Sequence, residues 1–441
     1  GASSDTIALA AGASQTGFGR TGTVDWITTP KVTGDSPITA VTGKGYFLNT
    51  TAGTITVNLP AGAAGSIVSL ADYAATWQTN NVTVTPNGAE KIGGLAQNAT
   101  LSTEGQSVTL VYVDSTQGWI NTMDSTSNVR GAPPYVVATG GTPCAGATCG
   151  DYKIHTFTGP GTFCVSNAGT PSGSDTVEYL VVAGGGGGGA SYGGGGGGGG
   201  FRFASPSGAP LTYPAKPLAG PANLPVTVQG YPIDVGSGGP GSTSHPAANS
   251  AKGSNSIFSS ITSSGGGAGA YTTNGSPGGS GGGGSVSGSP APTAVGTAGT
   301  ASPTTSPAQG TAGGTAYCGG GYKSGGGGGA VCVGTPSPNG CAGGEGGDGG
   351  GVPTIFGSNG VPCGSFRYYA GGGGGGGHNG PALNATPGGK GGGGATTYPA
   401  PAVGVDGTTN SGGGGGGGNK PQADNHAGGS GGSGVVIIRY K

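Results

Sequence analysis

Short runs of alternating apolar and polar residues predict β-structure in the first third of the chain. Thr54–Leu59 alternates with a period of two residues, and β-branched side chains dominate this run and four later ones. Those later runs are Ser66–Asp72, Asn81–Pro86, Ser107–Asp114 and Gly118–Thr122. No segment has an apolar helical repeat of useful length. The pattern predicts a β-sandwich-like domain over residues 1–130, in which Trp26, Trp77 and Trp119 serve as core or subunit-interface aromatics rather than as ligand-stacking rings.

A different pattern begins after residue 130. Residues 131–150 are rich in Pro, Gly and Cys and are expected to form a linker. Asp151–Val165 predicts a β-hairpin with its turn at Gly159–Gly161. Asp175–Ala183 predicts a strong strand that runs directly into glycine, and Gly434–Lys441 predicts a strand that emerges from a Gly/Ser block.

Between these strands the chain contains long uninterrupted glycine blocks. Glycine contributes 112 of the 441 residues, and the blocks include Gly184–Gly189, Gly193–Gly200, 265–267, 281–284, 325–329, 371–377, 391–394 and 412–418. So much glycine usually favours disorder, because glycine loses the most backbone entropy on folding. Flexible linkers, however, mix Gly with Ser and have no strands on either side. The bracketing strands therefore favour an ordered domain over residues 151–441.

The blocks break the rule of glycine at every third position that collagen requires, so collagen is excluded. Consecutive glycines can instead adopt the extended left-handed helix of the polyproline-II type, with a rise of about 3.1 Å per residue. Such a helix has no internal hydrogen bonds, so every N–H and C=O needs a partner outside it. Without side chains, neighbouring helices can approach closely and bond to one another. We expect packed glycine helices that short β-strands hold in register.

Charge and hydropathy exclude several classes of protein. The chain has 15 Lys and Arg against 16 Asp and Glu, so it lacks the basic excess of a nucleic-acid-binding protein. No apolar run approaches the ~20 residues of a membrane span, and no signal peptide is recognisable. The chain opens at Gly1 rather than Met, which indicates that an upstream part has been processed away or lies outside this numbering.

No constellation predicts catalysis, a metal or a cofactor. The motifs GxGxxG and GxSxG occur, but any glycine-rich tract produces them and no helix follows. The acidic residues are too scattered for the paired carboxylates of a glycosidase. The histidines lack HxxxH spacing and no CxxC pair is present. We therefore expect no enzyme, no catalytic residue, no metal site and no cofactor.

Seven cysteines leave at least one that cannot pair within the chain. Cys144 and Cys149 are candidates for a local disulfide, and Cys332 and Cys341 for a second one across a Pro/Asn turn. The remaining three could supply one more pair and a free thiol.

The stretches VEYLVVAGGGGGG, LPVTVQGYPIDVGSGGPG, GSNSIFSSITSSGGG and GSGVVIIRYK, in this order, resemble the glycine-rich domain of bacteriophage tail-fibre and adhesin proteins. The resemblance covers roughly residues 151–441. Residues 18–122 look like a β module of structural proteins of tailed phages. The resemblance implies a polyglycine-II sandwich at the end of an extracellular virion fibre, usually a homotrimer, with an N-terminal domain for attachment or trimerisation and other fibre and tail proteins as partners.

The resemblance also implies that loops between glycine blocks bind a host receptor, either a surface glycan or an outer-membrane protein. Tyrosine rings stack on sugars and donate hydrogen bonds, and several lie beside glycine blocks. The candidate contact residues are Tyr192, Tyr213, Tyr271, Tyr322, Tyr368, Tyr369, His378 and Tyr398. Alternatively, the tyrosines cover the ends of the glycine helices against water. Two other functions stay open: a purely structural virion fibre, head fibre or surface fibril without receptor binding, and a depolymerase tailspike.

Overall fold

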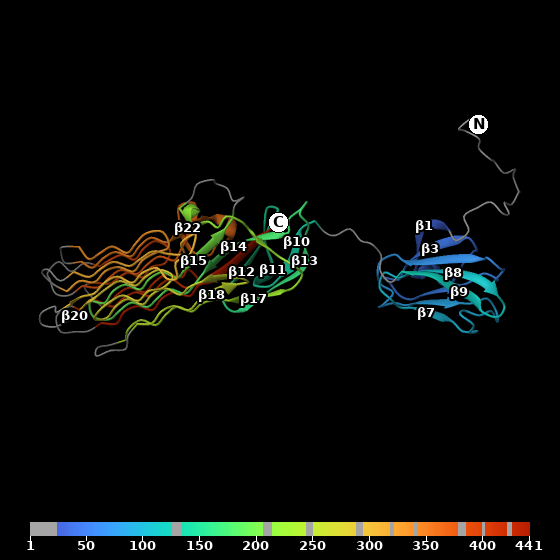
Figure 1. Ribbon diagram of the computed structural model, residues 1–441, viewed down its shortest axis with the longest axis horizontal. Coiled ribbons are helices and arrows are strands. Elements are labelled where there is room, and N and C mark those ends of the chain that lie inside the picture. The colour runs from blue at the N-terminus through green and yellow to red at the C-terminus, as the bar shows by residue number, and fades with distance from the viewer. Residues whose placement is uncertain are drawn as a thin grey trace, which may run out of the picture. The chain divides into compact units, whose positions relative to one another are not determined.

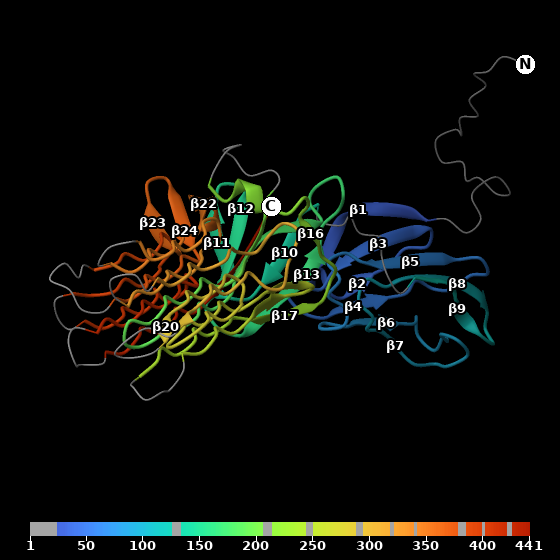
Figure 2. The same cartoon turned by 60° about the vertical axis from the view of Figure 1, so that its left-hand side comes forward.

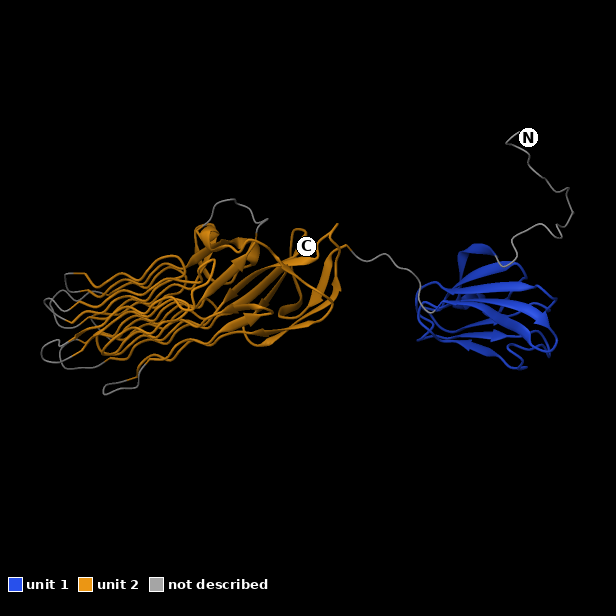
Figure 3. Cartoon of the chain, in the orientation of Figure 1, with its two compact units in different colours: residues 1–131 blue, residues 132–441 orange. Residues whose placement is uncertain are grey.

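The computed structural model describes residues 24–125, 134–205, 214–243, 250–287, 294–317, 322–338, 342–377, 385–398, 402–420 and 426–441. The chain forms two compact units, Gly1–Gly131 and Ala132–Lys441 (Figure 3). Both are built from β-strands and extended segments, which confirms the predicted mainly-β fold. The helical turns of the described residues are short 3₁₀ segments: η1 (Thr33–Asp35), η2 (Lys216–Leu218) and η3 (Thr354–Phe356).

The first unit is a two-sheet sandwich in which the chain alternates between the sheets. One sheet has the order β1-β3-β5-β8-β9 and the other the order β2-β4-β6-β7 (Figure 2). Because consecutive strands as far as β6 enter opposite sheets, neighbours such as β3 and β5 pair in parallel. The strands are β1 (Asp25–Val32), β2 (Ile38–Thr39), β3 (Lys44–Asn49), β4 (Ile55–Asn58), β5 (Ile67–Asp72), β6 (Val82–Thr85), β7 (Ala99–Leu101), β8 (Ser107–Asp114) and β9 (Gly118–Ser125).

Side chains from the inner faces of both sheets fill the core of this unit. Trp77 and Trp119 are completely buried in it, and the Trp119 indole N–H donates to Glu90 at 3.1 Å. Trp26 is instead 38% exposed and stacks on Phe47. The core role expected of the tryptophans is thus confirmed for two of the three.

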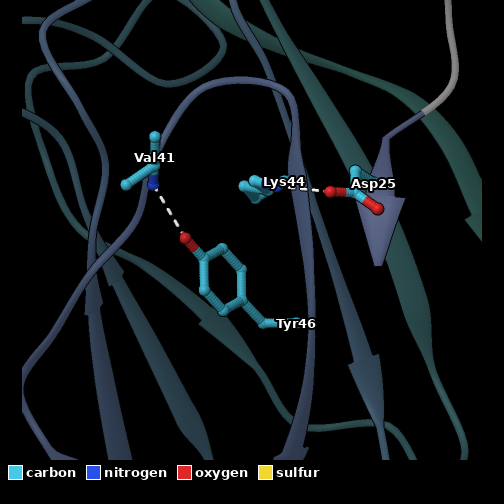
Figure 4. A network of polar contacts seen from close by, with 4 residues as sticks. All are labelled: Asp25, Val41, Lys44 and Tyr46. Carbon is cyan, nitrogen blue, oxygen red and sulfur yellow. Dashed lines mark hydrogen bonds and ion pairs between the residues drawn. The ribbon is translucent and has the colours of Figure 1, made fainter. Parts of the chain in front are cut away.

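Polar contacts fix the edge of the first sheet. The Lys44 ammonium pairs with the Asp25 carboxylate on the neighbouring strand, and the Tyr46 hydroxyl accepts the backbone N–H of Val41 at 2.9 Å (Figure 4). The second contact anchors the turn before β3 to the core, because the Tyr46 ring is buried.

The second unit begins as three stacked sheets. The first has the order β10-β13-β17-β18-β19, the second β11-β12-β25-β14-β15 with β16 beside β14, and the third β22-β24-β23. Their strands are β10 (Val136–Thr139), β11 (Thr142–Cys149), β12 (Tyr152–Phe157), β13 (Gly161–Ala168), β14 (Thr176–Val182), β15 (Phe201–Ala204), β16 (Leu224–Pro225), β17 (Gly230–Asp234), β18 (Ser256–Phe258), β19 (Ile261–Ser263), β22 (Gly350–Pro353), β23 (Val361–Cys363), β24 (Phe366–Tyr369) and β25 (Val435–Tyr440).

The middle sheet is covered on both faces. Val181 and Ile438 face the first sheet, where Phe163 and Phe258 pack against them. Leu180 and Ile437 point the other way, toward Phe356. A strand that is covered on both faces needs apolar residues at consecutive positions, which explains the unbroken runs in β14 and β25.

Two predictions for this part of the chain were wrong. The expected linker 131–150 contains β10 and β11, and Val136 and Ala138 of β10 are buried against β13. The expected hairpin in Asp151–Val165 does not form, because β12 pairs with β25 whereas β13 pairs with β10 and β17. The turn between them therefore carries the chain from one sheet to the next.

The glycine blocks run side by side away from the sheets, toward the short pair β20 (Val286–Ser287) and β21 (Ala294–Val295) (Figure 1). Their hydrogen bonds repeat every three residues. In block 193–200, Gly194 and Gly197 donate to one neighbouring segment, Gly195 and Gly198 to a second, and Gly196 and Gly199 to a third. The three neighbours are 267–270, 325–328 and 412–415, at N···O distances of 2.7–3.1 Å.

The carbonyl groups of the same block accept hydrogen bonds from three further segments, 186–189, 280–283 and 373–376. Three neighbours by donation and three by acceptance give the block six partners, the arrangement of a hexagonal lattice. The period of three residues is that of the polyproline-II helix. The predicted packing of polyglycine-II helices is therefore confirmed. These extended segments between residues 183 and 434 together form the glycine bundle.

Close approach explains why this lattice requires glycine. A Cβ built on Gly196 would lie 2.0 Å from the carbonyl oxygen of Gly186, and one on Gly195 would lie 2.0 Å from that of Gly373. At the rim of the bundle the requirement falls to one residue in three. In Gly296–Thr300, Gly296 and Gly299 are buried, whereas Thr297 and Thr300 are exposed.

Candidate binding site

The glycine bundle has two chemically different ends. At the sheet end its segments continue into strands: β14 leads into Gly184, and Gly434 leads into β25. At the opposite end, the loop end, the chain reverses through turns that carry side chains. The described turn residues that define the loop end are 190–192, 271–274, 285–287, 294–295, 322–324, 396–398 and 419–420.

Three of the expected contact residues meet at the loop end. The rings of Tyr192 and Tyr322 stack with centroids 5.2 Å apart, and the Ser285 hydroxyl donates to the backbone carbonyls of both Tyr192 and Tyr271. Yet Tyr192, Tyr271 and Tyr322 are 5%, 8% and 7% exposed. Burial raises the pKa of Tyr192 and of Tyr271, and in each case a neighbouring tyrosine adds to the rise. Their burial agrees with the alternative that tyrosines cover the ends of the glycine helices, while their contact with a receptor stays a prediction.

Tyr368 and Tyr369 lie at the sheet end, on β24. Tyr369 is completely buried and its hydroxyl donates to the carbonyl of Asn359 at 2.7 Å, while burial raises its pKa. Both tyrosines therefore lie beside a glycine block, as expected, but at the end where that block begins and not at the loop end. Tyr398 is half-buried at the loop end, and Tyr213 and His378 lie outside the described residues.

Lysines at the loop end were missed by the sequence analysis. Lys420 places its ammonium 5.7 Å from the centroid of the Tyr192 ring, and Lys323 lies 5.8 Å from that of Tyr317. Such cation–π contacts add to the packing of the tyrosine rings. Asn419 was missed too: its side-chain oxygen accepts the N–H of Gly377 and its amide donates to Thr397. Lys323 lies just before a glycine block, and Asn419 and Lys420 lie just after one. This position beside a block was the signal in the sequence that could have identified them.

The expected disulfide between Cys144 and Cys149 is not formed. Both cysteines are exposed free thiols on the single strand β11, so the chain does not fold back to bring them together. Cys332 is also a free, exposed thiol. Its expected partner Cys341 lies outside the described residues.

A polar pocket opens beside the turn at 271–274. Its volume is about 340 Å³, and the turn itself, the preceding segment and Ser250 line it. Its described lining consists of Ser, Thr, Asn, Tyr, Gly and Ala residues, so none of these lining residues has a charged side chain. Within the described part of the chain, no group of three or more His, Cys, Asp and Glu side chains could hold a metal ion, and no helix is long and apolar enough to cross a membrane.

A model of a known protein family matches most of the second unit. The family model of the glycine-rich domain matches residues 156–441, from within β12 to the last residue. None of the curated proteins compared with the chain matches it. The match includes strands β14, β15 and β25 of the middle sheet and the whole glycine bundle. Because it spans more than half of the 441 residues, the chain belongs to the glycine-rich domain family.

Proposed function

We propose that this chain is a subunit of a bacteriophage tail fibre or adhesin, located on the virion outside the cell, and that it binds a host surface glycan or outer-membrane protein through the loop end. One observation carries the proposal. A Cβ on the glycines of blocks 184–189 and 193–199 would collide with neighbouring carbonyl groups, so chemical variety is concentrated in the turns and the rim. Turns on a rigid scaffold can change in sequence without disturbing it, as recognition requires.

The charge of the chain disfavours one alternative ligand, nucleic acid. With a formal net charge of −1, the chain has no basic surface excess for nucleic acid. The first unit has a core of its own and could attach the chain to other fibre proteins or hold a homotrimer together, as the resemblance to phage proteins implies. Analytical ultracentrifugation of the full chain tests the trimer: a mass three times that of the monomer is expected.

Retention of the full chain on intact candidate host cells, with and without enzymatic removal of surface glycans, tests the function. Retention that disappears after glycan removal indicates a surface sugar, and retention that persists indicates an outer-membrane protein. A folded chain that binds no host would favour a structural fibre without receptor binding.

Matched variants then test the role of the loop end. Val295 is exposed at the loop end and Val333 is exposed near the sheet end. Val295→Arg and Thr273→Arg each place a bulky charge at the loop end, whereas Val333→Arg makes the same change away from it. We expect at least one loop-end variant to weaken cell binding about tenfold and Val333→Arg to bind like the unmodified chain. Normal cell binding by both loop-end variants, together with weakened binding by Val333→Arg, would place recognition away from the loop end.

A further inference from the structure

The polar pocket at the loop end has the size of a ligand site. Its volume of about 340 Å³ falls within the ~300–1,000 Å³ of small-molecule pockets. The side chains that matter for recognition are those of Ser250, Tyr271, Thr272, Thr273, Asn274 and Ser276. Four of these six residues come from the turn between Ala270 and Gly275, Ser276 follows directly after Gly275, and Ser250 comes from another segment.

Several polar atoms of this pocket are available to a ligand. Among the hydrogen bonds of the described residues, none uses the hydroxyls of Thr272, Thr273 or Ser276, and each hydroxyl can donate and accept. The side-chain oxygen of Asn274 accepts the N–H of Thr297 at 2.9 Å. This bond fixes the amide plane and leaves the two amide hydrogens as donors.

The backbone around the pocket is held in place before any ligand arrives. Ser285 donates to the carbonyl of Thr273, and Gly275 donates to that of Thr297, both at 2.9 Å. The backbone N–H of Ser276 donates to the carbonyl of Ala268 at the same distance, and the Ser250 hydroxyl donates to the carbonyl of Gly269. A turn fixed in this way loses little conformational entropy on binding.

Charge selects the class of ligand. None of the described residues that line the pocket is Asp, Glu, Lys, Arg or His, so a charged group would lose its hydration there without an ion pair from this lining. Hydroxyl and amide groups match a neutral molecule with many hydroxyls of its own. We propose, building on the binding function above, that the pocket holds one neutral hexose or N-acetylhexosamine unit of a surface polysaccharide.

The test uses the full chain on an array of neutral oligosaccharides of glucose, galactose, mannose and N-acetylglucosamine, beside sialylated and sulfated counterparts. We expect the chain to bind at least one neutral glycan. We expect no binding that depends on the sialic acid or sulfate group of the acidic glycans. The free monosaccharides are measured separately as competitors, which distinguishes recognition of a single sugar from recognition of a longer chain. Cell retention is measured in parallel with the same preparations.

Two variants change the pocket without changing its backbone. Thr273→Val with Ser276→Ala removes two hydroxyls and should weaken glycan binding about tenfold. Asn274→Asp keeps the acceptor for Thr297 but replaces the amide donors with a negative charge, and it should weaken binding at least as much. Thr300→Val is the matched control, an exposed threonine on the rim of the bundle outside the pocket lining, and it should bind normally. Thermal melting checks that each variant is folded.

The outcomes separate this inference from the function on which it rests. Cell retention together with no bound neutral glycan, or with glycan binding that neither pocket variant weakens, overturns the sugar pocket and leaves the adhesin proposal standing. If the unmodified chain shows neither cell retention nor glycan binding, the sugar pocket and the adhesin proposal are both overturned. Neutral glycan binding that falls in the two pocket variants and not in Thr300→Val supports the pocket.

Discussion

The first unit buries Trp77 and Trp119 between two sheets, whereas blocks 184–189 and 193–200 of the second unit meet with no side chain between them. In the first case the burial of apolar area stabilises the fold. In the second, each N–H finds a carbonyl on one of three neighbouring segments, and each ordered glycine gives up about 1–2 kcal/mol of backbone entropy. The difference shows that a lattice of backbone hydrogen bonds can serve as the interior of a folded unit, provided that strands fix its register.

The largest expected effect comes from a methyl group in the centre of the lattice. Gly196→Ala would place a Cβ 2.0 Å from the carbonyl oxygen of Gly186, and the three atoms nearest to it are all backbone atoms of Gly186 and Gly187, which cannot turn aside as a flexible side chain could. We expect the second unit to lose its cooperative melting transition while the first unit still melts. Circular dichroism and limited proteolysis would follow the two units separately.

Gly159→Ala is the matched control for this change. Gly159 lies in the turn between β12 and β13, and a Cβ there would have no atom within 4 Å. Its effect should stay within about 0.5 kcal/mol. Equal losses in Gly159→Ala and Gly196→Ala would mean that the lattice tolerates side chains, which would contradict the requirement for glycine.

The corresponding change in the first unit, whose interior consists of side chains, is a substitution that creates a large cavity. Trp77→Ala should lower the free energy of unfolding of that unit by about 3–5 kcal/mol, because it empties a completely buried site. Denaturant titration by tryptophan fluorescence would measure it. The melting of the glycine-rich unit should not move, since each unit has a hydrophobic core of its own.

A smaller effect should follow pH in the second unit. His155 is completely buried, with Nδ1 against the carbonyl of Gly140 at 2.7 Å and Nε2 against the Tyr440 hydroxyl at 2.9 Å. Burial lowers the pKa of His155 below its usual 6.5, although the bond to Gly140 opposes this. The unfolded chain therefore binds the proton more readily, and the stabilisation present above pH 6.5 is lost as the pH falls toward the folded pKa.

The loss should amount to at most about 1.4 kcal/mol per pH unit, the limit for one proton. Chemical denaturation of the second unit between pH 5 and 8 would measure it. His155→Phe should flatten this part of the profile. An unchanged slope in that variant would assign the pH dependence to other groups.

The smallest effect is expected on the rim of the bundle. Thr300→Lys changes an exposed side chain and should alter the free energy of unfolding by less than about 0.5 kcal/mol. The adjacent Gly299 has no such freedom, because a Cβ on it would lie 2.1 Å from the carbonyl oxygen of Ser276. Thermal melting of Thr300→Lys and Gly299→Ala would compare the two positions directly, and equal stabilities would contradict the one-in-three rule for rim segments.

The sequence predicted those features that depend on local patterns. The strands Ser107–Asp114 and Asp175–Ala183 carry their own alternation or apolar run, and the glycine blocks exclude every structure that needs side chains. The strand Val136–Thr139 was missed because four residues carry little signal until β13 pairs with them. Likewise, β12 pairs with the distant strand β25 and not with the adjacent β13, and the local sequence of β12 does not indicate this partner.

The candidate site was harder to predict, because burial at the loop end depends on which turns meet. Tyr192 and Tyr322 are 130 positions apart and stack only through the lattice between them. The pocket beside Asn274 likewise needs Ser250 and Thr297 from other segments. Its polar sequence TTNGS was visible, but a polar turn alone does not distinguish a pocket from a solvated loop.

Amide hydrogen exchange of the full chain tests the central claim most directly, because it reports on each backbone N–H. If the glycine blocks form a hydrogen-bonded lattice, the N–H groups of Gly193–Gly200 should exchange as slowly as those of β14 and β25, and far more slowly than those of the turn at Gly159. Exchange of these glycines at the rate of an unstructured chain, while β14 and β25 stay protected, would contradict the lattice and the rigid support it gives to the loop end.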